Sequence, residues 1–197
     1  MMSMQGYGNR VVSLAMGVGS AVLVAGLAAA AEPTKDELIE DALSAAPPAV
    51  RESAAVMDEK GDMLREGDSA YVCMPTAEAV REFGSEPMCL DEVWMRWADA
   101  WLNKKPFSTD RVGIGYMLAG DSAGASNIEP FATEPTADND WVVEGPHVMV
   151  IVPDPAQLAG LPDTPTEDGA YVMWKGTPYA HLMVPVGPRP EQRTPSQ

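Results

Sequence analysis

The sequence predicts a single α+β domain, with helices in its N-terminal part and a mainly antiparallel sheet formed largely by its C-terminal half. The helical patterns lie before residue 104, whereas most of the strand patterns lie after residue 110. The regular alternation of strands and helices that a parallel sheet requires is absent from the pattern. Of the 197 residues, 166 follow a predicted leader at residues 1–31, which is the usual size of one domain.

The first 31 residues are typical of a bacterial export signal. Arg10 supplies a positive charge, residues 11–27 are apolar, and Ala29 and Ala31 are the small residues expected before a cut at Glu32. Because about 20 apolar residues can span a bilayer, an uncleaved anchor is the alternative. The sequence therefore predicts a periplasmic or extracellular protein that keeps no stable membrane anchor after cleavage.

The chain that remains after cleavage is strongly acidic. The leader holds one of the 13 basic residues and none of the 29 acidic ones, so 12 basic residues remain against 29 acidic ones, a formal net charge of −17. A charge of this sign repels nucleic acid and anionic membrane surfaces. We therefore expect no nucleic-acid partner, and the charge favours solubility or the attraction of cations.

The N-terminal part is expected to contain one clear helix, followed by short strands. Residues 34–37 match a capping box, and the helix that follows should end at the prolines at 47 and 48. Apolar residues at 56–57 and 63–64 around a polar turn predict a hairpin, and residues 70–74 predict a third strand. A short helix is expected over residues 76–83, before Gly84.

The two cysteines predict a disulfide. Cys73 and Cys89 are separated by 15 residues and show no C-x-x-C spacing. In an oxidising compartment an isolated pair usually forms a structural bond. Closing a loop of this size would stabilise the fold by roughly 3 kcal/mol. The bond would join the strand at 70–74 to the start of the next helix.

The clearest helix is predicted over residues 91–103. Asp91 can cap its start, Pro106 follows its end, and apolar side chains recur at helical spacing along one face. Three of these side chains are tryptophans, which could form a ligand platform. The more ordinary interpretation is the core-packing face of a helix.

The rest of the chain is predicted to be mainly strands. Strands are expected at residues 112–118, 147–152, 170–174 and 180–186, with a turn at 175–178 joining the last two into a hairpin. Residues 120–140 are rich in Ser, Ala, Asn, Pro and acids and are expected to form a long loop. We therefore expect one domain over residues 32–187 and a disordered tail over residues 188–197.

Both histidines of the chain lie in a His-x-Met unit, His147–Met149 and His181–Met183. In a strand, residues two apart point to the same face. If the two strands are neighbours, two imidazoles and two thioethers could converge, and this ligand set suits copper, especially Cu(I). The competing interpretation is two core strands, in which methionine is apolar filling. The distance between the two imidazole rings separates these hypotheses.

Residues 120–124, Gly-Asp-Ser-Ala-Gly, match the G-x-S-x-G pattern of serine hydrolases. In that mechanism Ser122 would be the nucleophile and His181 the base that accepts its proton. The motif must lead into a helix, however, and Pro130 and the polar residues before it give no helical stripe. A serine hydrolase is therefore the third hypothesis.

Residues 141–149, Trp-Val-Val-Glu-Gly-Pro-His-Val-Met, together with residues 171–185, resemble a family of small exported bacterial proteins of unknown function. The resemblance implies export and a single domain, and it brings no activity, cofactor or site residue. We therefore expect a non-enzymatic binding or interaction protein, with a concave apolar site near Trp141, Trp174 and Tyr179. A copper binder that uses the two His-x-Met units is the second hypothesis.

Overall fold

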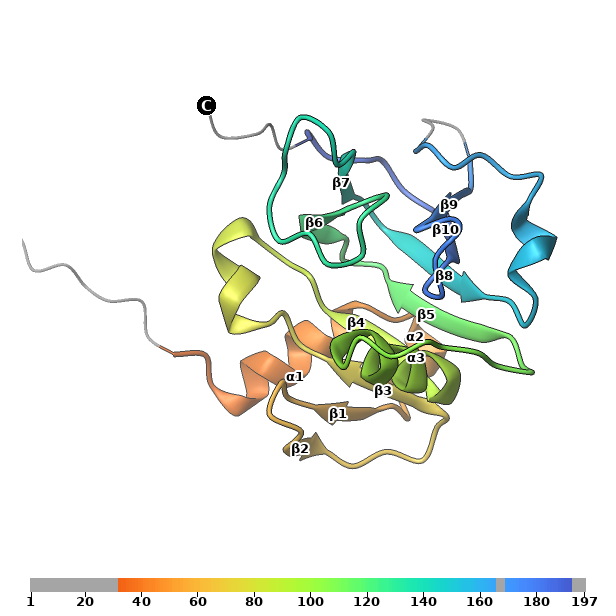
Figure 1. Cartoon of the computed structure of the whole chain (residues 1–197). Helices are drawn as coiled ribbons and strands as arrows, with labels where there is room; N and C mark the ends of the chain where they lie inside the picture. The colour runs from red at the N-terminus through yellow and green to blue at the C-terminus, as the bar shows by residue number, and fades with distance from the viewer. Residues whose placement is uncertain (1–31, 166–168, 193–197) are drawn as a thin grey trace, which may run out of the picture. The chain divides into compact units, whose positions relative to one another are not determined.

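The computed structural model describes residues 32–165 and 169–192. The predicted leader and residues 193–197 of the expected tail lie outside the described residues. The chain from Pro33 onward forms one compact unit of the α+β class, as the sequence predicts (Figure 1). Within the described residues, no helix has the length and apolar character needed to cross a membrane.

One mixed sheet of eight strands organises the fold. β1 and β3 are parallel neighbours, and the other adjacent pairs are antiparallel. The order is β2 (Met63–Arg65), β1 (Ala55–Met57), β3 (Tyr71–Met74), β4 (Met88–Asp91), β5 (Gly113–Met117), β8 (His147–Ile151), β10 (His181–Pro185) and β9 (Tyr171–Met173).

The expectation that the sheet comes largely from the C-terminal half is wrong. Four of its eight strands, β1 to β4, precede residue 92. β1, β2 and β3 lie where strands were expected, whereas β4 was not predicted. β4 was missed because it is only four residues long and its last residue, Asp91, is also the N-cap of the following helix.

The N-terminal helix and the first hairpin form as predicted. α1 (Lys35–Ser44) begins with the capping box, in which Thr34 and Glu37 bond to each other's backbone N–H groups. α2 (Pro48–Arg51) is a single turn that starts at the second of the two prolines. The short helix expected at 76–83 is a 3-10 helix, η1 (Glu78–Phe83), and Gly84 follows it.

α1 and α3 (Glu92–Leu102) cover opposite faces of the sheet (Figure 1). Cys89 packs with Ala42 of α1 and with the two alanines that follow the helix, whereas Leu90, the next residue of the same strand, packs with the tryptophans of α3. Successive strand residues point to opposite faces, so this alternation places the two helices on different sides. The predicted disulfide is confirmed, and it joins Cys73 and Cys89 at directly opposite positions of β3 and β4.

Two glycines of β5 leave room for neighbouring side chains, Gly113 for those of α3 and Gly115 for Met149 of β8. A Cβ at Gly113 would lie 2.8 Å from Val93 Cγ1, and a Cβ at Gly115 would lie 3.0 Å from the Met149 methyl carbon. Glycine in a strand often marks such a close approach. At Gly113 the absence of a side chain therefore sets the distance between α3 and the sheet.

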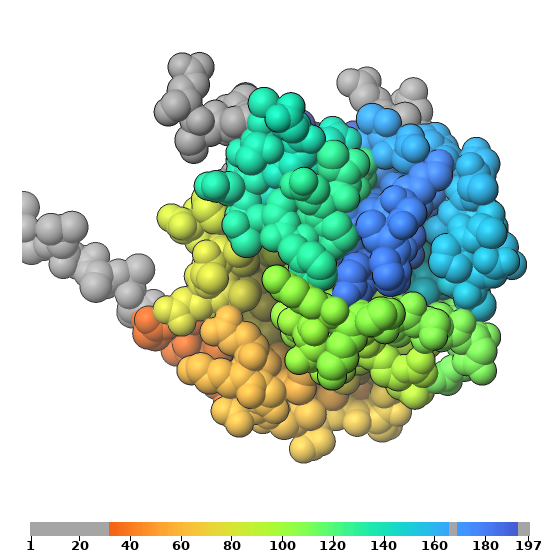
Figure 2. Space-filling view, in the orientation of Figure 1, coloured from red at the N-terminus to blue at the C-terminus, as the bar shows by residue number. Residues whose placement is uncertain are grey.

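The segment at 120–140, expected to be a long loop, contains a strand. β6 (Asp121–Ser126) pairs with β7 (Trp141–Glu144) in a separate two-stranded sheet. The expectation was wrong because alanine, glycine and serine have low strand propensity, and pairing with β7 supplies the stabilisation. The remaining residues, 127–140, lie beside α3, where Trp101 Nε1 donates a 2.8 Å hydrogen bond to Pro130 O (Figure 2).

The C-terminal part completes the sheet. β9 and β10 form the predicted hairpin, and a 3-10 helix, η2 (Pro155–Leu158), lies in the connection before them. After β10, the chain runs along β7, where Gln192 exchanges two hydrogen bonds with the backbone of Val143, at 2.9 and 3.0 Å. Residues 188–192 of the expected tail therefore pack on the domain.

Candidate functional site

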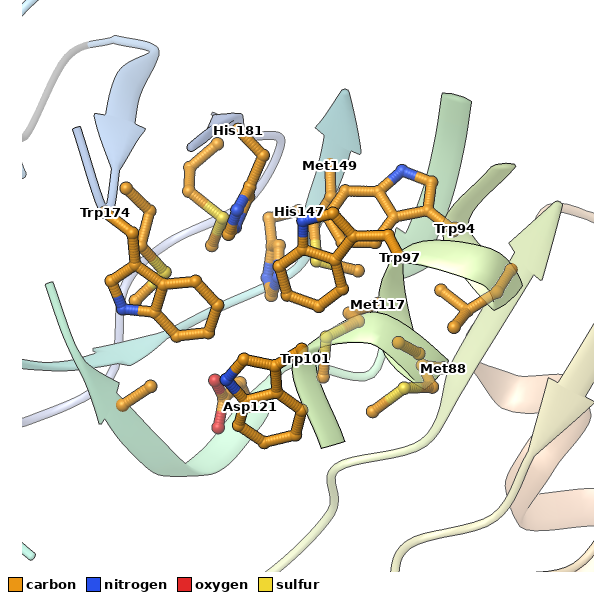
Figure 3. A pocket seen from close by; sticks show the side chains of 15 residues that line it. Met88, Trp94, Trp97, Trp101, Met117, Asp121, His147, Met149, Trp174 and His181 are labelled. Carbon is orange, nitrogen blue, oxygen red and sulfur yellow. The ribbon is translucent and has the colours of Figure 1, made fainter. Parts of the chain in front are cut away.

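A cavity of about 150 Å³ lies between α3 and the sheet (Figure 3). Its wall is mostly apolar and unusually rich in sulfur, because it takes five of the nine methionines that follow residue 31. The wall also contains two histidines, four tryptophans and one carboxyl group, that of Asp121. The methionines are Met88, Met117, Met149, Met173 and Met183.

Both His-x-Met units face this cavity, as the strand phase predicts. Their histidines and methionines are buried, and the residues between them are only partly buried. β8 and β10 are antiparallel neighbours, with Met149 directly opposite Met183 and His147 opposite Pro185. His147 and His181 therefore stand on either side of the methionine pair, with about 13 Å between their backbones along the strands.

Each histidine has three methionines as neighbours on the same face of the sheet. For His147, they are Met117 directly across on β5, Met149 two residues along, and Met183 diagonally on β10. His181 has an equivalent set, with Met173 directly across on β9. The Met149–Met183 pair belongs to both sets.

The tautomer of both imidazoles is fixed by the backbone. The ring Nδ1 of His147 donates to Gly145 O at 2.7 Å, and that of His181 donates to Tyr179 O at 2.9 Å. Since a carbonyl oxygen only accepts, Nδ1 carries the proton and Nε2 keeps its lone pair. Nε2 of His147 is buried and has no hydrogen-bond partner in the described part of the chain.

Both histidines are neutral at pH 7. Burial lowers the pKa of His181 to about 4. Burial also lowers the pKa of His147, although its bond to Gly145 and the nearby Asp121 and Glu144 oppose this. Neutral imidazole with a free lone pair is the form that binds a metal ion.

Four tryptophans line the cavity together with the histidines (Figure 3). Trp97 and Trp174 are parallel within 2°, with ring centroids 5.5 Å apart. The ring of His181 stands edge-on to them and to Trp94, at 5.1–5.4 Å. Nε1 of Trp94 and Nε1 of Trp97 are buried and, among residues 32–165 and 169–192, lack a hydrogen-bond partner.

The backbone of Trp174 is strained. Its φ of 54° lies in the left-handed region, which non-glycine residues seldom adopt. Its indole Nε1 donates to Ser126 O at 2.6 Å, which anchors the ring in the cavity wall. Strain of this kind persists where the surroundings fix it, and it is concentrated at functional sites.

A pair of acids shares a proton beside the cavity. Burial and the neighbouring Asp121 raise the pKa of Glu86 to about 8. The pKa of Asp121 is also raised by burial, while Gly124 N–H donates to its carboxylate at 2.7 Å. Two carboxylates cannot bond to each other, so the raised pKa places a proton on Glu86, which then donates to Asp121.

Of the three aromatic residues expected to line a ligand site, one lines the cavity and two do not. Trp174 lines the cavity, whereas Trp141 and Tyr179 do not; their side chains donate to the carbonyls of Ala123 and Lys105. Sequence reasoning missed Asp121, because β6 was not recognised. It missed Met117 and Met173 because strand order cannot be read from periodicity.

The serine motif forms a turn and a strand rather than a turn that enters a helix. Ser122 lies on β6, and its hydroxyl faces Gly84, where a Cβ would approach within 2.8 Å. It lines a separate surface cavity with Phe83 and Val143, whereas His181 lines the central cavity. The structure thus places the two proposed triad members in different cavities.

Metal ligation by carboxylates, thiolates and imidazoles alone is not available at the described residues. No three Asp, Glu, His or Cys side chains of the described ranges come together in a group that could hold a metal ion. A site in the cavity with three or more side-chain ligands would therefore include thioethers. Comparison of the chain with protein-family models, with curated proteins and with solved structures finds no match.

Proposed function

We propose that this chain is an exported, non-enzymatic binding protein that takes one small ligand into the central cavity. One observation carries the proposal: three residues that line this cavity each carry a buried polar atom without a partner among the described residues, namely Nε1 of Trp94, Nε1 of Trp97 and Nε2 of His147. Such atoms are rare in native proteins. Each costs about 1–3 kcal/mol, so three in one place favour a ligand that satisfies them.

The wall defines the kind of ligand. A cavity of about 150 Å³ accepts a molecule of the size of benzene or a single metal ion. The indole N–H groups call for an acceptor, and the imidazole nitrogen calls for a donor or a metal ion. The predicted leader and the disulfide are consistent with a periplasmic or extracellular location.

Phenol is a suitable first probe, because it combines a benzene ring with a hydroxyl group. We expect phenol to shift the indole N–H resonances of Trp94 and Trp97 in a ¹H–¹⁵N spectrum. The resonance of Trp141 should stay in place, because its N–H already donates to Ala123 O. Ala98→Leu, which fills the cavity from α3, should abolish the shifts.

Met95→Leu is the matched control, since Met95 belongs to the same helix but does not line the cavity. If the cavity resonances respond neither to phenol nor to Cu(I), the proposed function is wrong.

A further inference from the structure

We infer that the ligand of this cavity is a Cu(I) ion bound by the thioethers of Met149 and Met183 and by Nε2 of His147. This inference rests on the proposed function and names the ligand of the same site. Met117, which stands directly across from His147, is the fourth candidate ligand.

The sulfur atoms come from positions that face each other. Met149 and Met183 are directly opposite in the antiparallel pair of β8 and β10, and both line the cavity. Side chains at such positions have their Cβ atoms about 4.5–5.5 Å apart. Two unbranched side chains at this separation can place both sulfur atoms on one ion.

The imidazole is already oriented for ligation. His147 Nδ1 donates to Gly145 O at 2.7 Å, so its Nε2 lone pair is directed away from the backbone, and this nitrogen is buried without a partner among the described residues. A backbone carbonyl that holds the second nitrogen is the usual support of a metal-binding histidine. A histidine that served only as core filling would not need a free, buried lone pair.

The donor set selects the metal and its oxidation state. Thioethers are soft ligands that favour Cu(I), whereas Mg²⁺, Ca²⁺ and Mn²⁺ prefer oxygen ligands. Both cysteines of the chain are joined in the disulfide, so thiolates do not compete for the ion. An apolar wall with one lining carboxyl, that of Asp121, accommodates a monovalent ion better than a divalent one.

His181 has a different role from His147. The ring of His181 is enclosed edge-on by three indoles at centroid distances of 5.1–5.4 Å. This packing fixes His181 as part of the wall at the far end of the methionine pair. The structure thus distinguishes two histidines that are equivalent in the sequence.

The experiment is an anaerobic titration of the full-length exported protein with Cu(I), in competition with a chromogenic Cu(I) chelator. We expect one tightly bound ion per chain. Met149→Leu and Met183→Leu should each lower the affinity at least about tenfold, because loss of a ligand exceeds the effect of losing a supporting residue. Exchanging Met for Leu conserves volume, so these variants should fold.

Met95→Leu should keep the full affinity, because Met95 packs on the same core outside the cavity. His147→Leu should lose the ion, and the X-ray absorption spectrum of the Cu(I) protein should show one nitrogen and two or three sulfur scatterers. Absence of tight Cu(I) binding, or equal affinity in the Met149→Leu and Met95→Leu variants, would overturn the inference. Phenol binding without Cu(I) binding would overturn this inference and leave the proposed function standing.

Discussion

At the scale of single residues, the cavity wall contains groups whose burial opposes stability. His147 is fully buried, yet one of its ring nitrogens has no partner among the described residues, and the indole N–H groups of Trp94 and Trp97 share this condition. Packing alone does not account for such groups, because apolar side chains of similar shape would fill the same space without leaving a polar atom unpaired. A ligand that paired with these groups would remove the cost of burying them and so stabilise the folded protein.

His147→Leu tests this cost. The substitution removes an unpaired nitrogen but also the hydrogen bond to Gly145 O. The two effects oppose each other, so we expect the free energy of unfolding of the metal-free protein to change by about 1 kcal/mol or less. Urea denaturation at pH 7 measures it. A loss of several kcal/mol would show that His147 is an ordinary structural residue.

Glu86 should make stability depend on pH. Its pKa is raised to about 8 in the folded chain, chiefly by burial and by Asp121, so between pH 4.5 and 8 the folded state binds a proton that the unfolded state has lost. Stability therefore falls as pH rises through this window, by up to about 1.4 kcal/mol per pH unit. Asp121, whose pKa is also raised, acts in the same direction.

Between pH 6.5 and 8, the pH dependence of stability that comes from Glu86 can be measured apart from that of the histidines. His147 and His181 have lowered pKa values, so they reduce stability only as pH falls below 6.5. Glu86→Gln keeps a donor toward Asp121 and removes the titrating proton. Urea denaturation of this variant should show a flatter dependence from pH 6.5 to 8 than that of the wild type. Parallel curves would mean that Glu86 is ionised in the folded protein.

At the scale of elements, β5 and α3 set the depth of the cavity. Gly113 and Gly115 leave room for Val93 and for the methyl group of Met149. Gly113→Ala should therefore push α3 away from the sheet and cost about 1–3 kcal/mol of unfolding free energy. Gly160→Ala is the control, because no atom lies within 4 Å of its added Cβ. Equal stability of the two variants in thermal or urea unfolding would contradict this account.

The sequence predicted elements with strong local signals and missed those that depend on pairing. The helix at 91–103 was predicted because its apolar residues repeat at helical spacing and Asp91 caps it, and it forms from Glu92 to Leu102. β6 was missed because Asp-Ser-Ala-Gly-Ala-Ser has no strand signal of its own. The shared face of each His-x-Met unit followed from strand phase.

A concave apolar site near Trp174 was expected, but most of the residues that line the cavity could not be predicted. The cavity depends on strand order, which places β5, β8 and the β10–β9 hairpin side by side although the three are separated in sequence. Periodicity shows which face a methionine takes, but not which strand stands next to it. Met117 and Met173 therefore become candidates only once the register of the sheet is known.

At the scale of the whole molecule, a buried ion pair ties the end of the chain to the domain. Glu144 on β7 is buried, accepts 2.9–3.3 Å hydrogen bonds from Arg189, and also accepts one from the Tyr171 hydroxyl at 2.9 Å. Gly145 lies under this segment, where a Cβ would come within 2.0 Å of Pro188 O. Residues 188–192 thus take part in the fold.

Arg189→Met should destabilise the protein by about 3 kcal/mol, because it leaves the buried Glu144 carboxylate without its cation. Arg111→Met is the matched control, since Arg111 pairs with Glu92 at an exposed site, where an ion pair contributes little to stability. Urea denaturation of both variants at pH 7 gives the comparison. Similar losses would mean that the Glu144–Arg189 pair behaves as a surface pair.

The most direct test of the cavity as the binding site is a methyl spectrum of the protein labelled with ¹³C at its methionine methyl groups, recorded during addition of Cu(I). Met117, Met149 and Met183 line the cavity, whereas Met63 is 46% exposed and lies on the edge strand β2. We predict that the cavity signals move to new positions at one equivalent and that the Met63 signal stays in place. Unmoved cavity signals, or a response confined to Met63, would contradict the account.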